Sequence, residues 1–188
     1  IGSQMRILVV RFSSLGDLVL TSSPIKSLQQ AFPQAEIFLL TKGRYLDIAA
    51  GLPFVSQIIS FDSETKHKGI AGFFKLIQEL KTFNFDIIVD LHSNWRSFLI
   101  RRFLSAPQKI KYNKRSLARF LMVHWKSLKI KPKHTLELYN SALRKLEIFS
   151  TILPPQLNLK PEDSNWGVNY LKERNVFPGD YIVGLSPG

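Results

Sequence analysis

The feature that most constrains this chain is its first strand-like run, residues 6–12 (RILVVRF). The run is apolar and rich in β-branched residues between its arginines, which is typical of a strand buried on both faces of a parallel sheet. Residues 13–17 (SSLGD) are turn-forming. Residues 18–32 have helical spacing, with Leu18, Ile25, Leu28 and Phe32 forming one apolar stripe. Strand, turn and helix together predict the start of a βαβ unit.

The alternation of strand and helix continues along the chain. We expect strands at 35–40, 56–61, 85–91 and 109–112, and helices at 44–50, 72–81, 96–104, 116–123, 135–148 and 166–174. This order predicts an α/β protein with a Rossmann-like, doubly wound parallel sheet. Ligands of such sheets bind outside the carboxyl ends of the strands. The loops after Phe12 and Leu91 are therefore the expected functional edge.

The last part of the sequence predicts a second domain. Residues 151–163 contain prolines and read as an irregular linker. We expect an N-terminal Rossmann-like domain over 5–158, a linker and helix over 159–179, and the first strand of another domain over 180–188. That strand, residues 181–185 (YIVGL), is followed by Ser-Pro-Gly, as at the start of a new α/β unit. We therefore expect the sequence to be truncated, with a second Rossmann-like domain missing.

The positive charge of the chain is confined to one block. Its formal net charge is +12, and the segment from Leu91 to Leu136 holds twelve Lys or Arg and no Asp or Glu. A solvated helical face explains most charge runs, but ordinary surfaces mix the two signs. A field of one sign indicates an anionic partner, such as nucleic acid, anionic lipid or an acidic substrate.

The turn at 13–17 contains the clearest candidate for a catalytic residue in the sequence. It lacks the G-x-G-x-x-G of a dinucleotide site and the Lys-Ser/Thr of a P-loop, so it is not a usual pyrophosphate cradle. It offers small residues, Gly16 for tight backbone geometry, and one carboxylate, Asp17, at a helix start. Asp17 could be a helix N-cap. It could also take a proton from a sugar hydroxyl as that oxygen attacks, and the two roles are compatible.

The opening of the sequence resembles the lipopolysaccharide heptosyltransferases, glycosyltransferase family 9. The strand, the Arg-x-Ser-Ser-x-Gly-Asp turn and the helix that ends in Ala-Phe-Pro are similar in register, through Arg11, Ser13, Ser14, Gly16, Asp17, Thr21 and Ala31-Phe32-Pro33. The strand from Asp86 to His92 and the segment from His134 to Glu137 are similar as well. One departure is Ser23, where the family usually has the proline that this chain carries at Pro24.

The resemblance implies the N-terminal, acceptor-binding half of a GT-B glycosyltransferase. The family uses ADP-heptose as its donor substrate, and ADP-heptose is therefore the expected donor. The family inverts the anomeric carbon without a metal, so we expect no cofactor and no metal ligands. Asp17 is the expected general base, and Ser13, Ser14 and Gly16 the expected substrate-binding residues beside it. The donor-binding domain of the family lies beyond this sequence, so the chain alone is expected to be inactive.

The basic block fits the acceptor that the resemblance implies. The inner core carries Kdo carboxylates and lipid A phosphates, which Arg and Lys bind through charge-assisted hydrogen bonds. We expect Lys114 and Arg115 to contact the acceptor. No apolar run is long enough to span a bilayer, so we expect the chain at most to lie on a membrane. The resemblance implies the cytoplasm, with peripheral contact at the inner face of the cytoplasmic membrane.

Two other interpretations stay open from the sequence. Aromatic residues interleave with the basic block at Phe103, Tyr112, Phe120 and Trp125, which would suit a non-enzymatic module that binds nucleic acid or anionic lipid. Phe103 and Phe120 could instead be core residues, and Tyr112 and Trp125 could lie at a membrane interface. His92 and His134 could be metal ligands, but hydrogen-bonded structural histidines are more common, and the chain has no cysteine.

Overall fold

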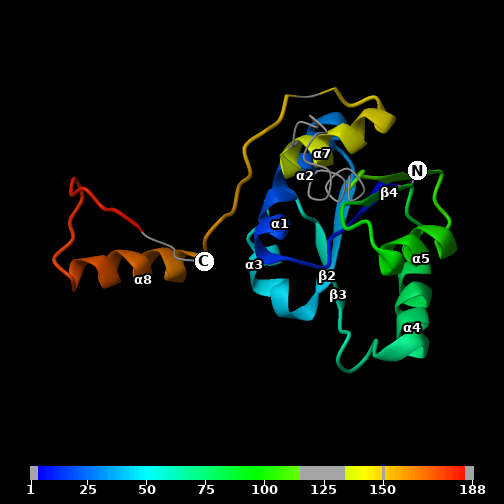
Figure 1. The fold of residues 1–188 in the computed structure, drawn as a ribbon, viewed down its shortest axis with the longest axis horizontal. Helices are drawn as coiled ribbons and strands as arrows, with labels where there is room; N and C mark the ends of the chain where they lie inside the picture. The colour runs from blue at the N-terminus through cyan, green and yellow to red at the C-terminus, as the bar shows by residue number, and fades with distance from the viewer. Residues whose placement is uncertain (1–3, 115–133, 150, 185–188) are drawn as a thin grey trace, which may run out of the picture. The chain divides into compact units, whose positions relative to one another are not determined.

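The computed structural model describes residues 4–114, 134–149 and 151–184. It contains two compact units, residues 1–157 and residues 158–188. The helix expected at 116–123, together with Arg115, Phe120 and Trp125, lies outside the described residues. Figure 1 shows the ribbon with its elements labelled.

The first unit is built on a five-stranded sheet in which every pairing is parallel. The strands lie in the order β3-β2-β1-β4-β5, and their bounds are β1 Arg6–Val10, β2 Glu36–Lys42, β3 Gln57–Phe61, β4 Ile87–Asp90 and β5 Gln108–Lys111. Val10 of β1 pairs with Leu40 on one side and with Asp90 on the other. The chain adds β2 and β3 on one side of β1, and it then returns to add β4 and β5 on the other side. The strand order therefore reverses between β1 and β4, which is the switch point of the sheet. That switch point is where doubly wound sheets bind ligands.

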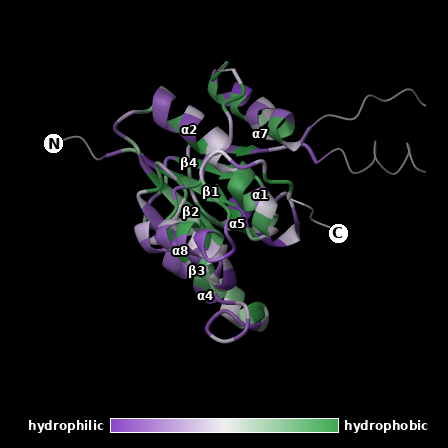
Figure 2. Cartoon of the chain, turned by 90° about the vertical axis from the view of Figure 1, so that its left-hand side faces the viewer, coloured by the Kyte–Doolittle hydropathy of each residue, from purple (hydrophilic) through white to green (hydrophobic). Residues whose placement is uncertain are grey.

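Alternate residues of the central strands pack into two separate cores, one on each face of the sheet. Ile7 and Val9 belong to one core, and Leu8 and Val10 to the other. The first core also contains residues of α1 (Leu15–Leu20), α2 (Ser22–Ala31), α3 (Leu46–Ala50) and α7 (Thr135–Leu143), and the second contains residues of α4 (Gly69–Lys81) and α5 (Trp95–Phe103). Short 3-10 turns at Gly43–Tyr45 (η1) and Arg144–Leu146 (η2) flank α3 and α7. The apolar interior between these layers is visible in Figure 2. The predicted α/β fold class is confirmed.

The helix predicted over 72–81 is confirmed as α4, and its residues Phe73, Leu76, Ile77 and Leu80 form one buried apolar stripe. The prediction of one helix over 18–32 was wrong in detail. The segment forms α1 and α2, which meet at Thr21. Pro24 consequently lies in the first turn of α2, where a missing N–H breaks no helical hydrogen bond. The shift of the proline from position 23 to 24 is thus accommodated by the start of a new helix.

The second unit contains one described helix, α8 (Pro161–Lys172). The predicted linker at 151–163 ends earlier than expected, since Pro161 opens the helix and Glu162 and Asp163 occupy its first turn, all of them favoured at helix starts. Residues 181–184 are not in a strand. A strand needs a paired neighbour, and the described residues provide none to this segment, so the expected strand is not formed there.

Candidate active site at the β1–β4 switch point

Arg11 links the two loops that follow β1 and β4. Its backbone N–H donates to the carbonyl of Leu40 at 3.0 Å, which continues the pairing with β2 by one residue. Its Nη1 donates to the carbonyl of Leu91 at 2.5 Å, and its Nη2 donates to Oδ2 of Asp17. The side chain is only 7% exposed. A buried guanidinium with a carboxylate partner holds the turn after β1 against the loop after β4.

Asp17 lies at the third position of α1, so the interpretation of Asp17 as the N-cap residue itself was wrong. Ser14 is the N-cap, and Asp17 reaches back to it as in a capping box. The hydroxyl of Ser14 donates to Oδ2 of Asp17 at 3.1 Å, and the Ser14 amide lies 3.5 Å from the same oxygen. These contacts and the Arg11 ion pair all use Oδ2. The Asp17 side chain is still 31% exposed, so solvent or a substrate can reach the carboxylate.

Asp90 ends β4 and is fully buried beside this site. Its Oδ1 accepts from the amides of His92 at 2.9 Å and Ser93 at 2.7 Å, and its Oδ2 accepts from Nε of Arg101 at 2.9 Å. Both oxygens are therefore occupied by donors of the loop and of α5. Asp90 fixes the backbone of the loop that Arg11 contacts.

His92 packs in the same loop, with its ring 5.1 Å from that of Phe12 in an edge-on arrangement. Burial lowers the pKa of His92 to about 4, and the positive charges of Arg11, Lys114 and Lys42 act in the same direction, while Asp90 opposes them. His92 is thus a neutral imidazole at pH 7. The influence of Lys42 and Lys114 on this ring means that cations from the ends of β2 and β5 face the same edge.

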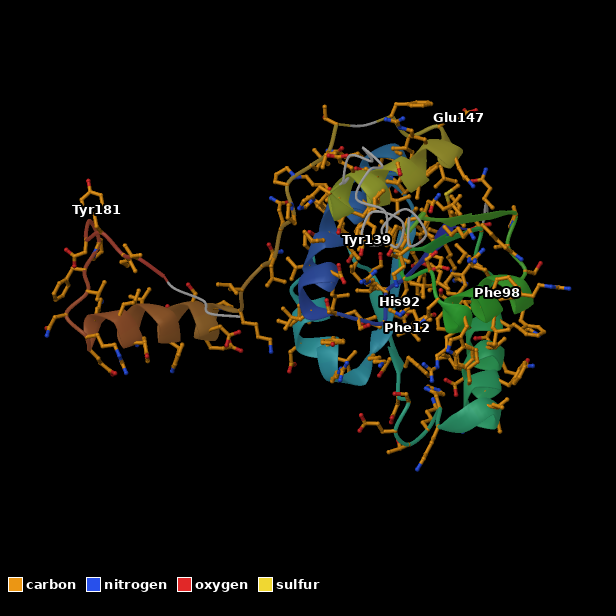
Figure 3. The ribbon with its side chains drawn as sticks, in the orientation of Figure 1. Phe12, His92, Phe98, Tyr139, Glu147 and Tyr181 are labelled. Carbon is orange, nitrogen blue, oxygen red and sulfur yellow. The ribbon has the colours of Figure 1, made fainter. Side chains whose placement is uncertain are left out.

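Tyr139 of α7 is a site residue that the sequence did not suggest. It is fully buried, and its ring lies 5.7 Å from the Arg11 guanidinium carbon. Figure 3 labels it together with Phe12 and His92 in the first unit. Burial raises the pKa of its phenol, Arg11 lowers it, and Asp17 raises it through its charge and a hydrogen bond. By strict hydrogen-bond geometry the hydroxyl has no partner among the described residues. The hydroxyl therefore lies beside the Asp17 carboxylate, at the margin of hydrogen-bond contact with it.

The other predicted site residues differ in where the structure places them relative to Asp17. Ser13 and Ser14 form the turn before α1 and are joined by a cis peptide bond. Gly16 lies inside α1, and a Cβ there would meet no atom within 4 Å. The expectation that Gly16 serves tight backbone geometry was therefore wrong, because the fold leaves open space at this position. Lys114 is exposed beyond β5, and Arg115 lies outside the described residues.

Two expectations for the basic block need correction. Phe103 is 41% exposed and Tyr112 only 4%, so Phe103 is not a core residue and Tyr112 cannot lie at a membrane interface. Tyr112 packs edge-on against Tyr139 at 5.0 Å instead. His134 is the N-cap of α7, where its Nδ1 accepts from the amide of Leu136 at 3.3 Å. Within the described ranges, no group of three potential metal ligands is found.

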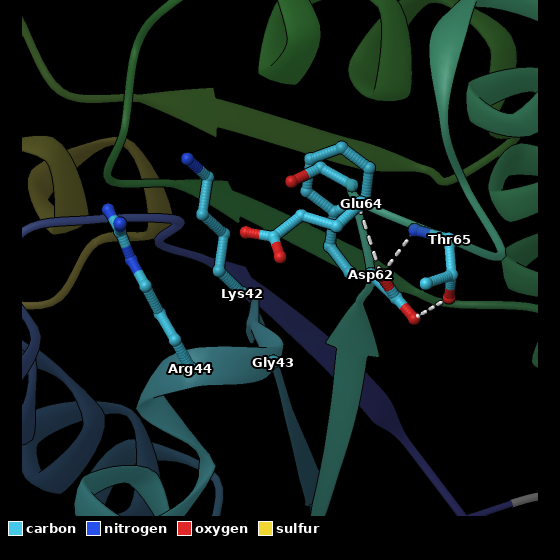
Figure 4. Close-up of a pocket in the computed structure, with 8 residues that line it drawn as sticks. Lys42, Gly43, Arg44, Asp62, Glu64 and Thr65 are labelled. Atoms are coloured by element: carbon cyan, nitrogen blue, oxygen red, sulfur yellow. Dashed lines mark hydrogen bonds between the residues drawn. The ribbon is translucent and has the colours of Figure 1, made fainter.

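A pocket of about 320 Å³ adjoins the switch point at the ends of β2 and β3. It is lined by Lys42, Gly43, Arg44, Phe61, Asp62, Ser63, Glu64 and Thr65. Lys42 and Arg44 extend in the same direction from neighbouring positions (Figure 4). Hydrogen bonds from Thr65 lower the pKa of Asp62 to about 2 and tie its carboxylate to its own loop. Lys42 and Arg44 are the cations of this pocket, and the Glu64 carboxylate lines it as well.

No described helix has both the length and the apolar character needed to cross a bilayer.

The curated proteins that match this sequence are lipopolysaccharide heptosyltransferases. No family model matches the chain. Over 97 residues, half of the chain, it is 31% identical to lipopolysaccharide heptosyltransferase 3 of Escherichia coli, and the match covers 28% of that enzyme. A glycosyltransferase family 9 structure from Veillonella parvula superposes over 97% of this chain and 55% of its own, with a TM-score of 0.74 and 20% identity.

A second solved structure, the E. coli heptosyltransferase WaaC with ADP-2-deoxy-2-fluoro heptose, superposes over 80% of this chain and 51% of its own, with a TM-score of 0.60 and 20% identity. The chain thus spans about half the length of these structures. Their likeness establishes the Rossmann-like fold of the GT-B type. By its sequence match, the chain is similar over half of its length to a lipopolysaccharide heptosyltransferase.

Proposed function

We propose that this chain is the acceptor-binding half of an inverting glycosyltransferase that moves heptose from ADP-heptose to the lipopolysaccharide inner core. The sequence relative is a lipopolysaccharide heptosyltransferase, and one structural relative holds an ADP-heptose analogue. The observation that carries the proposal is the Asp17 carboxylate, which is held by Arg11 at the switch point and is still open to solvent.

Asp17 acts as the general base in this proposal. An acceptor hydroxyl oxygen attacks C1 of the donor heptose, the bond from C1 to the ADP oxygen breaks, and its electron pair leaves with ADP. The hydroxyl proton passes to Asp17 as the new glycosidic bond forms, because that hydroxyl becomes acidic during the attack. The acceptor oxygen attacks the face of C1 opposite the departing ADP, which inverts the configuration of C1.

Arg11 positions the base. Its guanidinium and the Ser14 hydroxyl both bind Oδ2, so the orientation of the carboxylate is set before substrate arrives, as effective general bases require. We assign the proton transfer to Oδ1, the oxygen that these contacts do not use. The neutral ring of His92 and the hydroxyl of Tyr139 complete the wall of the site without adding a competing charge.

The cations around this edge are proposed to bind the acid groups of the acceptor. Lys42 and Arg44 line the pocket at the ends of β2 and β3, and the charge of Lys114 acts on His92. An inner-core acceptor carries carboxylates and phosphates, for which Arg and Lys are the usual partners. The predicted contacts of Lys114 and Arg115 stay part of this proposal, with Lys42 and Arg44 added from the pocket.

The test is Asp17→Asn in the complete protein that contains this chain, assayed with ADP-heptose and a Kdo-lipid A acceptor. We expect turnover to fall at least about 100-fold, the scale of general-base loss. Asp47→Asn is the matched control, since Asp47 is an exposed carboxylate in the first turn of α3 and should leave turnover unchanged. Turnover of Asp17→Asn within a few-fold of the wild type would overturn the assignment.

A further inference from the structure

The outer surfaces of α4 and α5 carry large apolar side chains that the first unit does not bury. Ile70, Phe74, Trp95, Phe98 and Phe103 are all exposed, with Ile70 at 76% and Trp95 at 57%. We call these five residues the α4–α5 face. Exposed apolar residues scattered singly need no explanation, whereas a contiguous group of this kind marks a contact surface.

Ring contacts and helix geometry show that the group is contiguous. Phe74 of α4 meets Phe103 of α5 with ring centroids 5.4 Å apart, and Phe73 meets Trp95 at 6.0 Å. Residues four apart share one side of a helix. Ile70 and Phe74 therefore lie together on α4, and Trp95 and Phe103 lie on one side of α5 with Leu99 between them. Figure 3 shows Phe98 on the outer side of α5.

The charges that flank this face are positive. Lys75, Lys81, Arg96 and Arg102 belong to the same two helices, and α5 contains no acidic residue, while Arg101 is paired with the buried Asp90. Glu79, the one acidic residue of α4, is bound by Lys66 at 2.9 Å and by His67 at 3.2 Å. The Arg96 guanidinium lies over the Trp95 ring at 4.5 Å. Apolar and aromatic residues bordered by Arg and Lys are the composition of surfaces that bind anionic lipid.

We infer that the α4–α5 face docks on an anionic lipid bilayer, with its aromatic side chains inserted at the headgroup level and the flanking cations on the lipid phosphates. Tryptophan is favoured at that depth, and Arg and Lys extend their charges to the polar side. The proposed contact is thus a face of the folded unit. It uses the cations that the basic block of residues 91–136 places in α5, and it differs from the rest of that block, the basic segment of residues 109–133.

The position of this face agrees with the proposed reaction. Trp95 and Ile70 lie at the starts of α5 and α4, and both helices follow strands at their carboxyl ends, which is the edge that holds Asp17. A bilayer against this face would lie beside the site that accepts a lipid-anchored sugar. This argument about orientation rests on the proposed function, whereas the contact with lipid does not and can be tested without any sugar.

The experiment uses the 188-residue chain with Trp125→Phe and Trp166→Phe, which leaves Trp95 as the only one of its three tryptophans. The probe is a phosphatidylcholine vesicle with about 30% phosphatidylglycerol, because that fraction supplies the negative surface potential of an anionic leaflet. We expect the Trp95 emission to shift to the blue and to be quenched by brominated lipid chains. Binding should fall at least about tenfold in roughly 0.5 M NaCl, where charge attraction is screened.

Substitutions separate the proposed face from other surfaces. The double variant Phe74→Ser with Phe103→Ser should lower vesicle binding at least about tenfold, because insertion of apolar area drives the contact. Phe54→Ser is the matched control, since Phe54 is also exposed, at 45%, but lies on the loop before β3, and it should bind as the parent does. Arg102→Gln should weaken binding roughly fivefold, as one cation near an anionic surface does.

Three results would overturn the inference. The first is that the chain does not bind these vesicles. The second is that it binds but Trp95 is not quenched, while neutralising Lys126, Lys129, Lys131 and Lys133 abolishes binding, which would assign the contact to the basic segment. The third is that the Phe74 and Phe103 double variant binds like Phe54→Ser. Because the vesicles contain no acceptor sugar, none of these results bears on the role of Asp17.

Discussion

Two carboxylates near the switch point, Asp17 and Asp90, are each paired with an arginine. The two pairs differ in which partner is buried. In the Asp17 pair the arginine is buried and the carboxylate is open, with exposed fractions of 7% and 31%. In the Asp90 pair the carboxylate is completely buried, and Arg101 is 17% exposed. Asp17 uses only Oδ2 in its contacts with Arg11 and Ser14, whereas Asp90 uses both oxygens.

The difference separates a reactive carboxylate from a structural one. A buried carboxylate whose two oxygens both accept hydrogen bonds stabilises the loop that supplies the donors, and its burial keeps it from a substrate. A partly exposed carboxylate held through one oxygen keeps the other available. The same pair of residue types therefore performs two tasks at one sheet edge, and the four predictions below address the two pairs in turn.

The largest effect is expected from Asp90→Ala. The substitution leaves the amides of His92 and Ser93 and the Arg101 guanidinium without their acceptor, so the free energy of unfolding should fall by about 3–5 kcal/mol. Chemical denaturation measures it. The counterpart is Asp17→Asn, which should lower the stability by less than about 2 kcal/mol, because the amide oxygen of asparagine can still accept from Arg11 and Ser14 and solvent reaches the side chain. Equal losses in the two variants would contradict the distinction.

The loop held by Asp90 should also make the stability depend on pH through His92. The folded pKa is about 4 and the ordinary value is 6.5. Between these values the unfolded chain binds a proton that the folded chain does not, so stability is lost as the pH falls from about 6.5 towards 4. Allowing for partial exposure, we expect a loss of about 1–2 kcal/mol between pH 7 and pH 5.

The variant His92→Gln isolates this contribution. It lacks the titrating group, so its stability should fall less than that of the wild type over the same interval, as measured by denaturation at each pH. Identical pH dependence in both proteins would show that His92 takes up its proton equally well in the folded state.

On the Asp17 side, Tyr139→Phe should separate stability from activity. The hydroxyl is buried without a partner among the described residues, so its removal should leave the stability unchanged or raise it by up to about 1 kcal/mol. If the hydroxyl serves a bound reactant, turnover of the complete protein should fall roughly three- to tenfold, the value of one hydrogen bond. A clear loss of stability would instead mean that the hydroxyl is satisfied within the fold.

The smallest effect on stability is expected from Gly16→Ala. Because a Cβ at this helical position meets nothing, alanine should stabilise the unit by a few tenths to about 1 kcal/mol. In the complete protein it should raise the KM for the acceptor, since the methyl group would fill space beside Asp17. Gly167→Ala is the matched control, because its Cβ would also meet nothing in α8 and the KM should not change. An unaltered KM for Gly16→Ala would remove this residue from the site.

Much of the first unit could be predicted from local patterns. The apolar run of β1 and the stripe of α4 identify their own burial, because their periodicity is a property of consecutive residues. The site was only partly visible. Asp17 stood out in its turn, but Tyr139 is one aromatic residue among many in an ordinary helix. Phe103 matched a core residue by type and was exposed, since exposure depends on what packs against a helix, and no local pattern records that.

The sequence by itself determined the α/β class, the order of its elements and the turn that carries Asp17, because these follow from hydrophobic periodicity and residue chemistry over short stretches. Only the tertiary structure decided that Arg11 joins Asp17 to the loop after β4, that Asp90 is buried and saturated, and that the aromatic residues of α4 and α5 meet on one surface. Those contacts join residues far apart in the chain, and their partners are set by how the strands and helices pack, which no single segment encodes.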